Sequence, residues 1–143
     1  MRSKSLTAGG VFVLVFENGD DVLTGLIEFA KVADIEGAFF SGVGAFQQAT
    51  IGFFDLSTKA YLHIPIDEQV EVMSLAGNIS RIEGKPKIHC HVVLGKRDGT
   101  ALGGHLIDGV VRPTLEVFLN TTETRLTRKI DESTNLPLID LID

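Results

Sequence analysis

From Gly37 onward the sequence is a series of short apolar or alternating runs, each separated from the next by a few turn-forming residues. Runs of this kind are typical of β-strands, and the glycine, asparagine, aspartate and proline between them indicate turns. Parallel strands need crossover connections of about a dozen residues or more, so such short gaps favour antiparallel pairing. The predicted strands are 38–44, 47–55, 59–64, 69–82, 86–96, 101–111, 114–120 and 122–130.

One helix is predicted upstream of these strands. The β-branched and aromatic run 11–16 predicts a buried strand, which turn formers at 17–20 end. Asp20 or Asp21 then offers an N-cap to a helix whose apolar residues recur at three- and four-residue spacing. The apolar stripe comprises Val22, Leu23, Leu26, Ile27, Ala30 and Ala33. We therefore expect an α+β fold, in which one main helix packs on a mostly antiparallel sheet that curls toward a barrel.

Length and composition indicate one soluble domain over residues 1–143. The chain is long enough to bury a continuous core, and 44% of its residues are apolar while 22% are charged. The tail 131–143 loses the strand pattern, although its apolar run 136–139 is able to dock. The longest purely apolar run, 11–16, is too short to cross a bilayer, and no signal-peptide pattern follows the N-terminus. A cytoplasmic location is therefore expected.

The charge of the chain disfavours direct nucleic-acid binding. Its net charge is −6, with 13 Lys and Arg against 19 Asp and Glu, whereas a protein that neutralises many phosphates normally has excess positive charge. A small basic group on the last predicted strand, made of Arg125, Arg128 and Lys129, is interpreted as protection of a sheet edge.

Two histidines lie on one face of a predicted strand. In the run 88–94, His89 and His91 alternate with apolar residues, so their side chains point the same way, roughly 6.6 Å apart along the strand. Cys90 points the other way and is interpreted as a small buried hydrophobe. Two imidazoles so placed can converge on one metal ion.

Whether His105 joins them depends on the turn that follows the strand. A two-residue loop at Asp98-Gly99 would turn His105 to the wrong face. A three-residue loop, Arg97-Asp98-Gly99 with Gly99 in the left-handed conformation, would place His105 directly across from His91. Gly103-Gly104 just before His105 also indicates a bulge or a close backbone approach. We predict the three-residue loop and hence a metal site made of His89, His91 and His105.

Three imidazoles with an open fourth position are typical of a catalytic or exchangeable zinc ion. Nickel, iron and copper also suit three nitrogen ligands, and three separately hydrogen-bonded histidines are the alternative to a metal. His63, alone before Ile64-Pro65, is predicted to be structural. Glu116 interrupts an apolar strand and Glu71 lies between two valines, so both are candidate proton-handling residues, with exposed surface carboxylates as the alternative.

Several motifs follow one another in the order of a known family. They are 39–45, 51–55, 71–79, His89-Cys90-His91, Asp98-Gly99 and 103–106. Their order resembles the PPC (plants and prokaryotes conserved) domain family along nearly the whole chain. The resemblance implies a homotrimer and a fold shared with acetolactate decarboxylase, where a similar set of three histidines holds zinc. In plant members the domain accompanies a DNA-binding AT-hook; the sequence printed here has none, and Gln69 stands where the plant proteins carry an arginine.

Two functions follow from these expectations. In the first, the chain is a homotrimeric regulatory, DNA-associated or protein-interaction module whose zinc site is structural or senses a small-molecule ligand. In the second, it is a zinc-dependent small-molecule enzyme of the acetolactate decarboxylase (lyase) type, with Glu116 or Glu71 handling protons.

Overall fold

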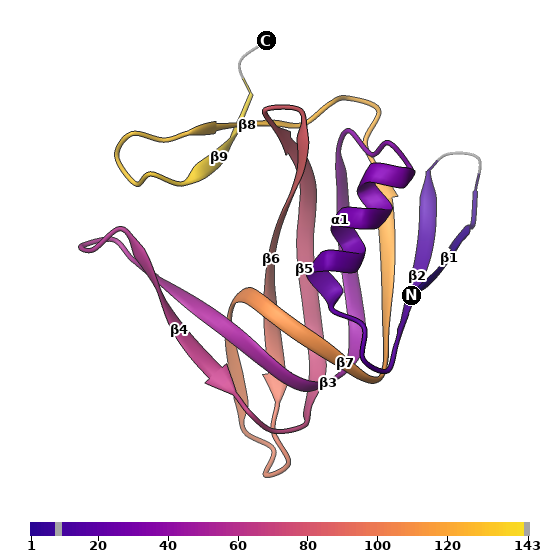
Figure 1. Ribbon diagram of the computed structural model, residues 1–143, viewed down its shortest axis with the longest axis vertical. Coiled ribbons are helices and arrows are strands. Elements are labelled where there is room, and N and C mark those ends of the chain that lie inside the picture. The colour runs from indigo at the N-terminus through magenta and orange to yellow at the C-terminus, as the bar shows by residue number, and fades with distance from the viewer. Residues whose placement is uncertain (8–9, 142–143) are drawn as a thin grey trace.

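The computed structural model describes residues 1–7 and 10–141, whose strands form a nine-stranded sheet with one α-helix against it (Figure 1). The elements are β1 (Arg2–Ser5), β2 (Val11–Glu17), α1 (Val22–Val32), β3 (Ala38–Asp55), β4 (Ala60–Ile66), β5 (Val70–Ile82), β6 (Lys85–Gly95), β7 (Ala101–Thr121), β8 (Thr127–Ile130) and β9 (Pro137–Asp140). The predicted α+β class is confirmed, because one helix lies on a mostly antiparallel sheet.

The sheet closes only partly. Strands β3 and β6 each pair with both β5 and β7, so these four strands form a partial ring. The other strands extend from the ring: β1 and β2 beside β7, β4 beside the second half of β3, and β8 and β9 beyond β5. One parallel bridge, Arg81 to Thr127, joins β8 to β5 and makes the sheet mixed. The expected curl toward a barrel is therefore present as a partial ring, and the other strands project from this ring without forming a complete barrel.

Helix α1 begins where its sequence predicts. The Asp21 carboxylate accepts a hydrogen bond of 2.8 Å from the Thr24 amide, which satisfies one of the free N–H groups of the first turn. Its buried face is formed by Val22, Gly25, Leu26, Phe29 and Ala30. The helix lies against β6 and β7, the two strands that carry the three histidines, so its burial supports the site from behind.

Two pairs of predicted strands are continuous in the structure. The runs 38–44 and 47–55 form β3, and 101–111 and 114–120 form β7. The β3–β7 register shifts between Gly44 and Phe46, and Pro113 falls where the ladder is interrupted, so its missing N–H group costs no ladder bond. A Cβ atom on Gly42 would lie 2.8 Å from the Glu116 carbonyl oxygen, which explains this glycine by tight strand packing.

The end of the chain differs from its prediction. Only Thr127–Ile130 of the predicted strand 122–130 forms a strand, and it pairs with β9 in the tail. The docking expected of 136–139 is confirmed, because Pro137–Asp140 forms β9 and pairs with β8. The short strand β1 was not predicted, because Arg2–Ser5 has no apolar alternation. None of the described residues forms a helix with the length and apolarity needed to cross a membrane.

Candidate metal centre

The alternation predicted for the histidine strand is present in β6. Ile88, Cys90, Val92 and Leu94 are buried, whereas His89 is half-buried and His91 exposed. Burial raises the pKa of the Cys90 thiol to about 12, so the thiolate that would bind metal or attack a substrate is scarcely populated. Cys90 is thus confirmed as part of the core.

The three-residue turn is also confirmed. The Lys96 amide donates to the Thr100 carbonyl at 2.8 Å and the Gly99 amide to the Lys96 carbonyl at 3.0 Å, with Gly99 at φ +84°. The Asp98 carboxylate accepts from both the amide and the hydroxyl of Thr100, which fixes the loop. This turn sets the register of β6 and β7, and His91 lies directly opposite His105.

Glycines let the neighbouring strands approach His105 closely. His105 is also paired with Gly52 of β3. A Cβ atom on Gly104 would lie 2.9 Å from the Gly52 carbonyl oxygen, and one on Gly52 would lie 2.8 Å from Cδ1 of Tyr61. The bare backbone therefore lets the Tyr61 ring of β4 lie against His105, with ring centroids 4.8 Å apart. The expected close approach at Gly103-Gly104 is confirmed at Gly104, while the nearest bulge in β7 falls after Leu106.

The three imidazoles form one compact group. Their centroids are 5.3 Å apart for His89–His91, 5.3 Å for His89–His105 and 5.5 Å for His91–His105. One ring nitrogen from each lies within 4.8 Å of the others. Three nitrogens around a tetrahedral zinc ion, at Zn–N of about 2.05 Å, are about 3.3 Å apart. Small side-chain rotations would close this difference, so the three residues fit a metal ion.

Burial prepares the rings of His89 and His105 to be neutral ligands. Nδ1 of His105 is buried and has no hydrogen-bond partner among the described residues. A buried polar atom left unpaired costs about 1–3 kcal/mol, and native proteins rarely keep one without a function. Burial, followed by the charges of His89 and His91, lowers the pKa of His105 to about 4, and burial followed by the Arg128 charge lowers that of His89. Neutral imidazole is the form that binds a metal.

A pocket of about 130 Å³ opens beside His89 and His105. Its other walls include Lys87 of β6, the strand that carries two of the histidines. They also include residues from segments that the sequence did not connect with the site, namely Tyr61 of β4, Arg128 of β8 and the tail residues 136–138. Lys87 lies two residues before His89, and strand alternation was a sufficient signal to find it. Local sequence gave no signal for the others, because they arrive through pairings between distant segments.

The interpretation of Arg128 as edge protection is wrong. The Arg128 side chain is half-buried against β5, where Nε donates to the Ser80 hydroxyl at 2.6 Å and Nη2 to the Asn78 side-chain oxygen at 2.7 Å. Its Nη1 donates to the carbonyl of Pro137 and so ties the tail to the sheet. Because Asn78 is the cross-strand partner of His89, these bonds place the guanidinium beside the histidine group.

The other candidate residues lie apart from the three histidines. Glu116 is exposed on β7 between Val15 and Val43, and Glu71 is exposed on β5 opposite Gly95. Neither carboxylate belongs to the group whose ligand atoms converge, and their proton-handling roles stay predictions. His63 is exposed on β4 opposite Gly52 and is also outside the group.

Comparisons with known proteins agree with this geometry. The profile of the Plants and Prokaryotes Conserved (PCC) domain, the family that the sequence motifs resemble, matches residues 3–123. A metal-containing protein of Archaeoglobus fulgidus is 34% identical with a TM-score of 0.84 and covers 97% of this chain and 99% of its own. A PPC protein of Pyrococcus horikoshii is 32% identical with a TM-score of 0.87 and the same coverage.

A third solved structure, a Bacteroides thetaiotaomicron protein described provisionally as DNA-binding, is 28% identical. Its TM-score is 0.92, and the match covers 97% of this chain and 96% of that one. Acetolactate decarboxylase of Bacillus subtilis is 13% identical with a TM-score of 0.57, over 77% of this chain and 51% of the enzyme, which shows a shared fold alone. Among curated proteins, none matches significantly.

Proposed function

The chain belongs to the Plants and Prokaryotes Conserved domain family, and on that premise we propose that it is a zinc-binding homotrimeric module with a regulatory or protein-interaction role. The observation that carries the proposal is the convergence of His89, His91 and His105 to within 4.8 Å, with a buried nitrogen of His105 unpaired. The metal content of the similar Archaeoglobus protein supports it.

Zinc is the metal that this donor set favours. Among the described residues the group consists of three imidazoles with no carboxylate or thiolate, which leaves an open position typical of exchangeable or catalytic zinc. Nickel, iron and copper also accept three nitrogen ligands. The ion must therefore be identified by elemental analysis of the purified protein.

Metal analysis of protein purified without added metal tests the site. We expect about one zinc ion per chain in the parent and His63→Ala proteins, and a large loss in His89→Ala, His91→Ala and His105→Ala. His63→Ala is the matched control, because His63 is exposed and outside the group. A metal-free parent, with unchanged folding in all three ligand variants, would contradict the proposal.

An exposed apolar patch supports the proposed trimer. Phe39 and Val43 of β3 and Phe118 of β7 are exposed by 58%, 57% and 48%, and the pairing of Ser41 with Phe118 brings the two strands side by side. Contiguous exposed apolar side chains are typical of subunit interfaces. Light scattering should give three times the chain mass of 15.5 kDa, and Phe39→Asp should lower it. A parent protein that is monomeric at micromolar concentration would contradict a trimer.

We propose that this module does not bind DNA directly. A net charge of −6 repels a phosphate backbone, so an association with DNA would pass through protein partners. Electrophoretic mobility of random duplex DNA at low salt should not change when the protein is added. Tight binding under those conditions would refute this part of the proposal.

A second function is favoured by the pocket beside the histidines. A pocket of about 130 Å³ with a metal at one wall suits a small-molecule enzyme, of which acetolactate decarboxylase is the type suggested by fold. The metal would polarise a carbonyl or activate a water molecule. Glu116 and Glu71 are the proposed proton-handling residues, although neither lines this pocket within one chain. Turnover of acetolactate that is lost in His105→Ala and reduced in Glu116→Gln or Glu71→Gln would support this function.

A further inference from the structure

The pocket beside the three histidines has an unbalanced charge. Its polar lining includes Lys87, Arg128, His89 and His105, and none of the described carboxylates lines it. A divalent ion held by neutral imidazoles would add two further positive charges. Like charges near one another in a partly buried site repel strongly, so an anion in the pocket would relieve the repulsion. The pocket therefore favours a negatively charged occupant.

Arg128 presents unused donors in this pocket. A guanidinium has five N–H groups, of which Ser80, Asn78 and the Pro137 carbonyl accept one each. One N–H on each terminal nitrogen has no acceptor among the described residues. None of the ion pairs found between described residues includes Arg128, whereas Arg81 pairs with Asp34 and Glu36. A planar guanidinium held by three bonds is preorganised for an oxyanion.

The remaining pocket wall is apolar. The ring of Tyr61 and the side chains of Ile88, Leu136, Pro137 and Leu138 line it. This wall suits a short hydrocarbon body, which inorganic phosphate lacks. We propose that Arg128 and the metal site together hold a small organic carboxylate, whose head lies at the guanidinium and whose short apolar body lies on Tyr61 and the β9 segment.

This inference rests on the metal site of the proposed function, and one experiment separates the two. The protein is loaded with cobalt(II), whose visible absorption reports uptake and changes in coordination. It is then titrated with butyrate, with the uncharged isostere butyramide and with inorganic phosphate, and affinities are measured by calorimetry. Cobalt uptake tests the proposed function, while the affinity for butyrate tests the subsite.

The structure offers a matched pair of arginine variants. Arg128→Gln should take up cobalt as the parent does and bind butyrate at least tenfold more weakly. Arg125→Gln should leave cobalt uptake and butyrate affinity unchanged, because Arg125 lies just before β8, pairs with Glu36 and does not line the pocket. Butyramide should bind at least tenfold more weakly than butyrate in the parent protein.

A second pair of variants tests the subsite if Arg128→Gln does not fold. Leu138 lines the pocket and is 47% exposed, so its replacement is expected to be tolerated. Leu138→Glu should weaken butyrate binding at least tenfold, because its carboxylate repels the ligand. Leu138→Gln should weaken butyrate binding by less than threefold.

Three results would overturn the subsite. They are butyrate affinity unchanged in Arg128→Gln and Leu138→Glu, butyramide binding as tightly as butyrate, and phosphate binding more tightly than butyrate. A parent protein that takes up no cobalt would refute the proposed metal function. In such a protein calorimetry would still test the part of the subsite that Arg128 forms. Butyrate binding that depends on Arg128 would support that part, and absent binding would overturn the whole subsite.

Discussion

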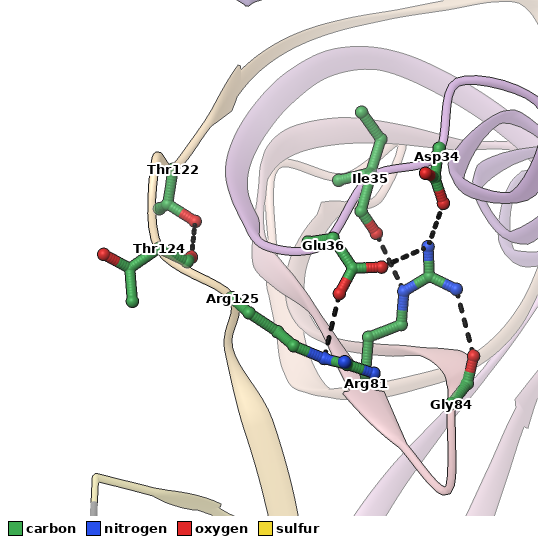
Figure 2. A network of polar contacts seen from close by, with 8 residues as sticks. All are labelled: Asp34, Ile35, Glu36, Arg81, Gly84, Thr122, Thr124 and Arg125. Atoms are coloured by element: carbon green, nitrogen blue, oxygen red, sulfur yellow. Dashed lines mark hydrogen bonds and ion pairs between the residues drawn. The ribbon is translucent and has the colours of Figure 1, made fainter. Parts of the chain in front are cut away.

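Two polar clusters that involve the β5–β6 hairpin differ in how fully their nitrogen atoms are paired within the protein. Near its turn, the buried Arg81 side chain donates from Nε to the Ile35 carbonyl at 3.0 Å and from Nη1 to the Gly84 carbonyl at 3.1 Å, as Figure 2 shows. Its Nη2 lies 3.2 Å from the Asp34 carboxylate and 3.1 Å from that of Glu36. Every nitrogen of this guanidinium has an acceptor inside the protein.

The histidine cluster is the opposite case. Its ring nitrogens converge on one another, His105 Nδ1 has no partner among the described residues, and the neighbouring charges of Lys87 and Arg128 are positive. A buried polar group that is fully paired stabilises the fold, whereas one left unpaired carries a cost that a ligand can remove. The comparison therefore assigns the Arg81 network to stability and the histidine cluster to binding.

The largest expected effect is on metal affinity. His105→Ala removes one of three ligands and should weaken zinc binding by about 1000-fold, equivalent to ~4 kcal/mol. The metal-free variant should remain folded, because the parent leaves a His105 nitrogen unpaired. Competition with a coloured zinc chelator measures the affinity. Unfolding of the metal-free variant would show that His105 stabilises the fold and does not serve binding alone.

The next largest effect is on unfolding. Arg81→Ala leaves the Ile35 and Gly84 carbonyls without their donor and should lower the free energy of unfolding by about 3 kcal/mol in urea titrations. Arg125→Ala is the control, since its exposed ion pair with Glu36 should be worth about 0.5 kcal/mol or less. Folded Arg81→Ala protein should still bind zinc, and a loss of zinc from it would couple the two clusters.

Acid should destabilise the metal-free protein through the histidine cluster. The lowered pKa of His105, about 4 against an ordinary 6.5, means that the unfolded chain binds the proton more readily. This contribution to stability is fully present above about pH 6.5 and is lost as the pH falls toward about 4. A shift of this size corresponds to about 3 kcal/mol, and solvent screening of the half-buried His105 side chain reduces the expected loss to roughly 2 kcal/mol. His105→Gln should make the free energy of unfolding depend less on pH over this range. Identical pH profiles for the parent and the variant would show that the effect does not come from His105.

The smallest effect separates two adjacent glycines. Gly104→Ala would place a Cβ atom 2.9 Å from the Gly52 carbonyl oxygen and should cost about 1–2 kcal/mol of stability. Gly103→Ala meets its nearest atom at an ordinary 3.4 Å and should cost less. Thermal unfolding compares the two. Equal costs would show that the approach of β3 to β7 does not depend on Gly104.

Local sequence was sufficient for the hairpin that carries the histidines. The period of two in β6 places His89 and His91 on one face, and Asp98-Gly99 has the chemistry of the three-residue turn that turns His105 toward them. The alternation within β5 and β7 likewise exposes Glu71 and Glu116. It does not show how far these two residues lie from the metal ligands. Face and register are local properties, whereas distances between strands depend on how the sheet curls.

Only the tertiary structure decided what surrounds the histidines. Tyr61 reaches His105 because β4 folds back on β3 at Gly52, and Arg128 reaches the pocket through a single parallel bridge between Arg81 and Thr127. Both contacts join segments far apart in the chain, and neither leaves a pattern within its own segment. The sequence by itself thus determined the three ligands, since a strand period and one turn govern them. Long-range pairing determined the pocket, because it sets which distant side chains share a volume.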